Sequence, residues 1–316
     1  MRRSRRFLSR WQNWVALILV FSFTFVSIAA PLLSPDDLKR PGPFKIVGRS
    51  TDNQPRPPSE KAPLGTLPGQ VSIYHLLVWG TRDAMQFGLV VVLGTAIIGI
   101  LIGAVAGYTG GLVNRLMMRV TDAFLTLPII AGVVLLEQLW LNAVATTRGL
   151  SAVFSGADIA QSTDSFIQVL LRRVDPLTLT LILLSWMPYA RLINTLVIRL
   201  KETDYVVAAH AVGAKPGRIL FRHILPNAIA PTIVIAARDV GGFVILSATL
   251  TFIHLGGSSL WGIVLAAGRD WVIGPGGNVL SYWWTFLPAT LAIILFGITW
   301  NLLGDGLSEL LDPHTS

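Results

Sequence analysis

The fold class is decided by residues 84–108, which read AMQFGLVVVLGTAIIGILIGAVAGY. The stretch contains no Asp, Glu, Lys or Arg, and it exceeds the roughly 20 apolar residues that an α-helix needs to cross a bilayer. In the whole chain of 316 residues, 53% are hydrophobic and only 13% are charged, against about 25% charged in a soluble domain. These values exclude a water-soluble globular protein.

Five further apolar stretches are long enough to span a membrane as helices. Each is too long and too continuous for a β-barrel, whose strands alternate in polarity over about ten residues. We therefore expect an all-α polytopic membrane protein with six transmembrane helices. The expected spans are 14–30, 84–108, 123–143, 177–198, 228–252 and 283–303. Residues 71–79 are expected to form a short interfacial helix within an outer loop, residues 31–83.

The basic residues predict the orientation. Five arginines precede the first span, and cytoplasmic loops are enriched in Lys and Arg. Six spans then place both termini in the cytoplasm, with residues 1–13 as a basic segment and 305–316 as a tail. A cleaved signal peptide is the alternative, but Trp11 and Trp14 are typical of an anchored helix at the membrane interface. The net charge of +8 indicates contact with anionic lipid rather than nucleic acid.

Charged residues inside expected spans are candidates for the translocation path, because charge is costly in lipid. Glu137, Arg238 and Asp239 are the candidates. Arg238 and Asp239 are adjacent and point about 100° apart on a helix, so we expect them to pair with other helices rather than with each other. Arg191 lies near the end of its span, where its side chain reaches the headgroups.

The sequence assigns no chemical reaction to this chain. It has no Cys, so it has no disulfide and no thiolate metal site. The five His residues lack the spacing of a metal site, and no phosphate-binding loop is present for ATP hydrolysis. We expect no catalytic residue, no metal and no bound cofactor.

Small residues recur every four positions in the second span, at Gly99, Gly103 and Gly107. This spacing lets another helix approach closely. It favours packing within the chain over a dedicated dimer interface.

The stretch DYVVAAHAVGAKPGRILFRHILPN, residues 204–227, is unusual for a simple linker. It predicts two short helices, with Asp204 capping the first, Gly213 ending it in a left-handed conformation, and Pro216 in the first turn of the second. The second is amphipathic and is expected to lie at the membrane surface, before Pro226 redirects the chain into the fifth span.

The first short helix carries the small residues Ala208 and Ala209, which leave it narrow enough to enter a groove on a partner. The loop resembles the Glu-Ala-Ala-x3-Gly-x9-Ile-x-Leu-Pro signature of the permease subunits of bacterial ABC importers, in which it docks on the ATPase subunits. Val207 stands at the Glu position and His223 at the first Ile position. The resemblance implies a coupling loop at 199–227 whose contact residues are Asp204, Val207, Ala208, Ala209, Gly213, Ala214, His223, Leu225, Pro226 and Asn227.

Other motifs narrow the resemblance to the second permease type of the dipeptide, oligopeptide and nickel importers. They are PLGT at 63–66, GTR at 80–82, AGYTGG at 106–111, RHILPN at 222–227, and NLLGDGL at 301–307 followed by LDP at 311–313. The resemblance implies the type I ABC importer permease fold, with a core at residues 84–304.

The resemblance also implies partners and a location. The partners are a homologous second permease, two cytoplasmic ATPase subunits that hold ATP and Mg, and an extracytoplasmic solute-binding protein. The location is the cytoplasmic membrane of a bacterium, and the substrates are short peptides, with nickel or another small solute as alternatives. The rival class is an ATP-independent secondary transporter that uses Glu137 or Asp239 as its ion-coupling group.

Overall fold

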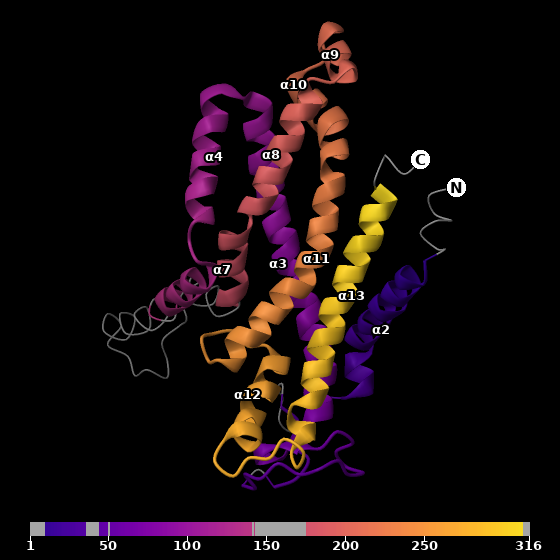
Figure 1. Ribbon diagram of the computed structural model, residues 1–316, viewed down its shortest axis with the longest axis vertical. Helices are drawn as coiled ribbons and strands as arrows, with labels where there is room; N and C mark the ends of the chain where they lie inside the picture. The colour runs from indigo at the N-terminus through magenta and orange to yellow at the C-terminus, as the bar shows by residue number, and fades with distance from the viewer. Residues whose placement is uncertain (1–9, 36–43, 50, 141, 143–174, 312–316) are drawn as a thin grey trace, which may run out of the picture. The chain divides into compact units, whose positions relative to one another are not determined.

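The computed structural model describes residues 10–35, 44–49, 51–140, 142 and 175–311 (Figure 1). The chain divides into two compact units. Unit 1 comprises residues 1–92 and 233–316, and unit 2 comprises residues 93–232. Helices α3 (Ile73–Thr109) and α11 (Leu225–Phe252) each contribute to both units.

Five described helical segments are long and apolar enough to cross a membrane, and a bent pair of helices adds a sixth. This confirms the predicted all-α polytopic class. The five segments are Trp11–Leu33, Ile73–Thr109, Pro176–Lys201, Pro216–Phe252 and Trp283–Leu311, and the bent pair is Gly111–Leu125 with Ile129–Trp140.

The third expected span, 123–143, is wrong in its start and in its shape. Helix α4 (Gly111–Leu125) begins earlier, directly after α3. The next helix, Ile129–Trp140, is bent from α4 by 87°. Pro128 accounts for the break, because proline has no N–H to continue a helix and disfavours the helical conformation of the residue before it.

The expected interfacial helix at 71–79 is not separate from the second span. Helix α3 runs without interruption over 37 residues from Ile73. The prediction ends the interfacial helix just before Gly80, but Gly80 lies within α3. Its missing side chain makes room for Trp261, since a Cβ there would lie 2.5 Å from the indole Cδ1. The outer loop therefore ends at residue 72, eleven residues earlier than the predicted boundary at 83.

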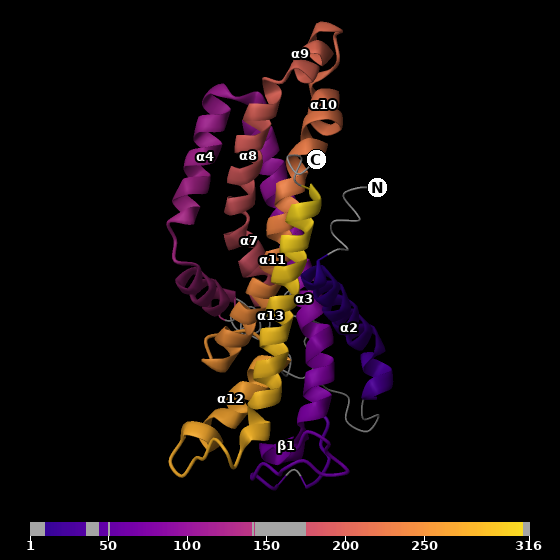
Figure 2. The ribbon, with the colours of Figure 1, turned by 45° about the vertical axis from the view of Figure 1, so that its right-hand side comes forward.

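Unit 1 is built around aromatic packing between its helices. Helix α2 (Trp11–Leu33) lies along α13 (Leu287–Leu311), as both views show (Figures 1 and 2). The ring of Phe23 meets Phe296 edge to face at 5.2 Å, and the buried Trp261 of α12 (Leu260–Ile273) packs against both rings. The residues expected to form a tail from 305 include the last turns of α13.

A small hairpin completes the outer part of unit 1. Strands β1 (Thr66–Leu67) and β2 (Val71–Ser72) are antiparallel. The turn between them includes Gln70, which has a φ of 58°. Its side-chain Nε2 donates to the backbone carbonyl of Gln54 at 2.9 Å. Its backbone carbonyl accepts from the N–H of Val47, also at 2.9 Å. These bonds hold Val47 and Gln54 to the hairpin.

Unit 2 is built on close helix packing. Helix α8 (Met187–Lys201) follows α7 (Pro176–Ser185), whose first turn is capped by Asp175. Where α3 meets α8, a Cβ added at Gly99 would lie 2.5 Å from the carbonyl of Trp186, and one at Gly103 would lie 2.3 Å from that of Ala190. The glycines thus allow backbone contact within the chain, as their spacing predicts.

Candidate functional site

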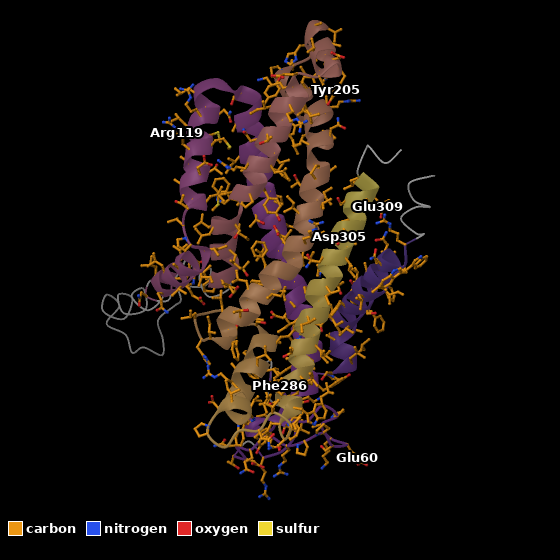
Figure 3. The ribbon with its side chains drawn as sticks, viewed as in Figure 1. Glu60, Arg119, Tyr205, Phe286, Asp305 and Glu309 are labelled. Carbon is orange, nitrogen blue, oxygen red and sulfur yellow. The ribbon has the colours of Figure 1, made fainter. Side chains whose placement is uncertain are left out.

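The predicted coupling loop lies at the end of unit 2. Helix α9 (Asp204–Ala211) follows α8 and lies beyond its end (Figures 1 and 2). The chain then forms α10 (Pro216–Ile219), a π-helical turn η2 (Leu220–Ile224) and α11. Tyr205, the second residue of α9, is labelled in Figure 3. The first predicted short helix is therefore confirmed, whereas the second is the beginning of the continuous helical segment Pro216–Phe252.

The first helix starts one residue earlier than predicted. Thr203, with an extended ψ of 147°, occupies the cap position. Asp204 lies instead in the first helical turn, where its negative charge interacts favourably with the positive end of the helix dipole. Its predicted role as a cap is wrong, because the backbone at 204 is already helical.

The first helix ends as predicted. Gly213 has a φ of +79°, which a residue without a Cβ adopts at little cost. Its N–H donates to the backbone carbonyl of His210 at 2.9 Å, and the N–H of Ala214 donates to the backbone carbonyl of Ala209 at 3.1 Å. This pair of bonds is the Schellman motif. Pro216 then lies in the first turn of α10, as expected.

The second short helix does not lie on the membrane surface. Its apolar residues Ile219, Leu220 and Ile224 are buried in one cluster with Ile193 and Val197 of α8. Pro226 does not redirect the chain, since residues 216–252 form one continuous helical segment. The wide turn of η2, in which the N–H of Leu225 donates to Leu220, relieves the clash that a proline ring makes in an α-helix.

The predicted contact residues divide between an outer and an inner side of the loop. One group is exposed: Asp204, Val207, Ala208, Gly213, Pro226 and Asn227. The other is half-buried: Ala209, Ala214, His223 and Leu225. On α9 the anchor is Val206, which is fully buried, whereas Val207 is 56% exposed. Three apolar residues of α9 and its C-terminal cap, Tyr205, Val207 and Val212, are exposed.

Asn227 links the two sides of the loop. Its Nδ2 donates to the carbonyl of His223 at 2.8 Å, and the hydroxyl of Tyr205 lies 3.5 Å away. The first turn of α11 is thereby connected to the start of α9. Sequence reasoning placed Asn227 in the loop but did not pair it with Tyr205.

The charged candidates for the translocation path do not gather in one unit. Glu137 is nearly buried on the helix Ile129–Trp140 of unit 2, whereas Arg238 and Asp239 belong to α11 in unit 1. Arg238 forms an ion pair of 2.5 Å with Asp305 of α13. The expectation that Arg238 pairs with another helix is confirmed, and the pairing indicates a structural role.

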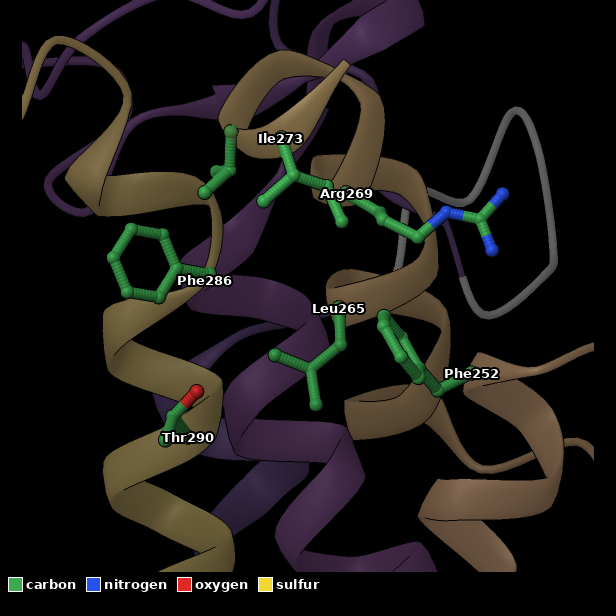
Figure 4. Close-up of a pocket in the computed structure, with 7 residues that line it drawn as sticks. Phe252, Leu265, Arg269, Ile273, Phe286 and Thr290 are labelled. Carbon is green, nitrogen blue, oxygen red and sulfur yellow. The ribbon is translucent and has the colours of Figure 1, made fainter. Parts of the chain in front are cut away.

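Unit 1 contains an apolar pocket of about 270 Å³ between α11, α12 and α13 (Figure 4). The guanidinium of Arg269 points away from the pocket centre, as Figure 4 shows. The pocket includes none of the predicted path residues. It is lined by Phe252, Leu265, Arg269, Val272, Ile273, Phe286 and Thr290. Thr290 is its main polar group, so the pocket offers few hydrogen-bond partners to the amide groups of a peptide.

The loop lies within the part of the chain that matches a known protein family. The family described as "Binding-protein-dependent transport system inner membrane component" matches residues 99–316, which include all of α9, α10 and α11. The chain belongs to this family. The type I ABC importer permease fold expected from the sequence is thereby confirmed.

Individual relatives of this permease are peptide transport components. The dipeptide transport system permease protein DppC of Alkalihalophilus pseudofirmus is 31% identical over 95% of this chain and 84% of its own length. The probable D,D-dipeptide transport system permease protein DdpC of Escherichia coli is 29% identical over 94% and 85%. The oligopeptide transport system permease protein OppC of Bacillus subtilis is 27% identical over 98% and 87%.

Proposed function

We propose that this permease translocates short peptides across the bacterial cytoplasmic membrane, with both of its termini in the cytoplasm. Its partners are a homologous second permease, two cytoplasmic ATPase subunits that bind ATP and Mg, and an extracytoplasmic solute-binding protein. The relatives named for dipeptides and oligopeptides support the substrate class. This chain binds no cofactor and makes or breaks no bond.

The observation that carries the proposal is the exposed helix α9. Val206 anchors its inner face, and Tyr205 and Val207 are exposed on its two flanks, so α9 presents a short ridge with apolar sides that fits a groove on an ATPase subunit. Lys215, Arg218 and Arg222 are exposed next to this ridge. We expect the groove to be apolar at its centre and acidic at its rim.

The exposed Val207 also changes the expected chemistry of the contact. The family signature has Glu at this position, and a carboxylate there would offer a charge to the ATPase. The valine offers only apolar area, so in this permease the hydrophobic effect replaces any ion pair at that point.

Transport then follows from the movement of this ridge. Closure of the ATPase pair on ATP moves α9, and the helices attached to it open the cavity between the two permeases outward. Hydrolysis restores the inward-facing state. Concentrating a peptide a thousandfold costs about 4 kcal/mol, so the contacts of the two permeases with the ATPase subunits together transmit at least that free energy in each cycle.

Gly213 provides the test. Replacing it with Val places a β-branched residue at a φ of +79°, at a cost of about 1–2 kcal/mol, which reduces the population of the native loop by roughly 5- to 30-fold. We expect Gly213→Val to lower uptake of labelled alanine peptides of two to five residues in proteoliposomes holding all subunits, while the ATPase subunits still hydrolyse ATP.

Gly217→Ala is the matched control. A Cβ at Gly217 meets no atom within 4 Å, and its φ is not positive, so uptake should stay at the wild-type rate. Normal uptake by Gly213→Val would contradict the coupling role of the loop. Uptake by the wild type that persists without ATP and disappears with the proton gradient would favour a secondary transporter instead.

A further inference from the structure

We propose that Tyr108 is a positioning residue that fixes α9 against the end of α3 and passes the movement of α9 directly to α3. This inference rests on the proposed function, because it concerns the movement that ATP drives. Tyr108 lies in the AGYTGG motif of residues 106–111 and is the penultimate residue of α3.

The first contact joins Tyr108 to α9. Its hydroxyl lies 3.4 Å from Nε2 of His210, and Nδ1 of His210 lies 3.1 Å from the carbonyl oxygen of Val206. A carbonyl only accepts hydrogen bonds, so Nδ1 carries a proton. In the tautomer that leaves Nε2 unprotonated, the Tyr108 hydroxyl donates to α9.

The second contact joins Tyr108 to α8. The ammonium of Lys201, the last residue of α8, donates to the carbonyl of Tyr108 at 2.8 Å. It also lies 5.6 Å from the centre of the tyrosine ring, within the range of a cation–π interaction. The carbonyl is one of the last four of α3, which have no partner inside the helix. Tyr108 is thus held by the helices on both sides of the turn at 202–203.

These contacts set the direction of α9. Val206 and His210 are four residues apart, so they lie on the same face of the helix. Val206, buried in the apolar cluster with Ile193 and Val197, anchors the first turn of α9. The attachment at His210, one turn away, restrains the second turn and keeps the apolar ridge facing the ATPase.

From Tyr108 the movement enters a stiff pair of helices. A Cβ at Gly107 would lie 3.0 Å from the carbonyl of Asn194, and the contacts at Gly99 and Gly103 are closer still. Helices in backbone contact shift together rather than deform. A displacement of α9 therefore moves α3 and α8 as one body, in addition to pulling on α11 through the chain.

Tyr108→Phe tests the inference. The substitution keeps the ring and its contact with Lys201 but removes the donor to His210. A hydrogen bond of ordinary net strength sets the expected effect, which is a fall of about two- to tenfold in the peptide transported per ATP hydrolysed. The ratio is measured in proteoliposomes containing the full complex and its binding protein, with labelled alanine peptides of two to five residues as the probe.

The matched control is Thr109→Val. Its hydroxyl, one residue away, donates to Val105 at 2.8 Å within α3, so its removal leaves α9 untouched and the ratio unchanged. An equal fall in both variants would show general weakening of α3 and would overturn the inference. The amount of assembled complex, measured by size-exclusion chromatography, should be the same for both.

A double-mutant cycle assigns the effect to the contact with α9. If Tyr108 acts through His210, Tyr108→Phe combined with His210→Ala lowers the ratio no further than either change alone. Additive losses would overturn the inference. A wild-type complex without ATP-driven uptake would refute the proposed function itself, whereas a coupled wild type with an equally coupled Tyr108→Phe variant would refute only the role of Tyr108.

Discussion

At the scale of single residues, Gly103 shows how little space separates the helices of unit 2. A Cβ there would lie 2.3 Å from the carbonyl of Ala190, closer than any van der Waals contact. Because the neighbouring atom is backbone, it cannot move aside as a flexible side chain would. Even the smallest side chain must push α3 away from α8.

We therefore expect Gly103→Ala to lower the free energy of unfolding by about 1–3 kcal/mol, the usual cost of overpacking. Thermal unfolding of the purified permease in nanodiscs measures this as a fall in Tm. Gly242→Ala is the control, because a Cβ at Gly242 of α11 meets no atom within 4 Å and alanine is the better helix former. An unchanged Tm for Gly103→Ala would contradict the close approach.

At the scale of elements, α4 and α8 are joined by polar pairs on facing sides. Arg191 forms an ion pair of 2.6 Å with Asp122, and Nδ2 of Asn194 donates to Oδ1 of Asn114 at 2.7 Å. The sequence predicts that Arg191 reaches the headgroups, and the structure adds that it pairs with a second helix. Helix α4 is bent by 87° from the helix that follows it, and these two polar pairs fix it to α8.

Exchanging the charges tests this pairing. Each of Arg191→Asp and Asp122→Arg alone should destabilise the protein, and we expect the double variant to recover part of the loss. Since the two side chains are 56% and 45% exposed, the recovered free energy should not exceed about 1 kcal/mol. Chemical denaturation of the four proteins gives the coupling energy, and a value of zero would mean that the ion pair does not join the helices.

At the scale of the whole molecule, the absence of Cys makes the proposed orientation directly testable. Single cysteines at Glu60, in the outer loop, and at Val212, next to the end of α9, should lie on opposite sides of the membrane. Both positions are exposed, and Glu60 is labelled in Figure 3.

A membrane-impermeant maleimide added to intact spheroplasts should label Glu60→Cys but not Val212→Cys. Permeabilisation should make Val212→Cys reactive, which serves as the control for accessibility. Labelling of Val212→Cys in sealed spheroplasts would reverse the proposed orientation and separate α9 from any cytoplasmic ATPase.

The sequence alone determined the features that depend on nearby residues. The span at 14–30 and the helix at 228–252 follow from the length of their apolar runs, because a bilayer of fixed thickness demands that length. The turn at Gly213 follows in the same way, since only a residue without a Cβ adopts its φ freely. The coupling role proposed for the loop around Gly213 comes from the family motifs.

Tertiary structure alone decided which distant residues meet. Tyr108 and His210 are 102 residues apart in the sequence, and Asn194 and Asn114 are 80 apart. Neither pair has a local signal, because each contact exists only after α3 and α8 have packed through their glycines. The burial of Ile219 and Ile224 has the same origin: an amphipathic pattern states that one face is apolar, and the packing of neighbouring helices decides whether lipid or protein covers it.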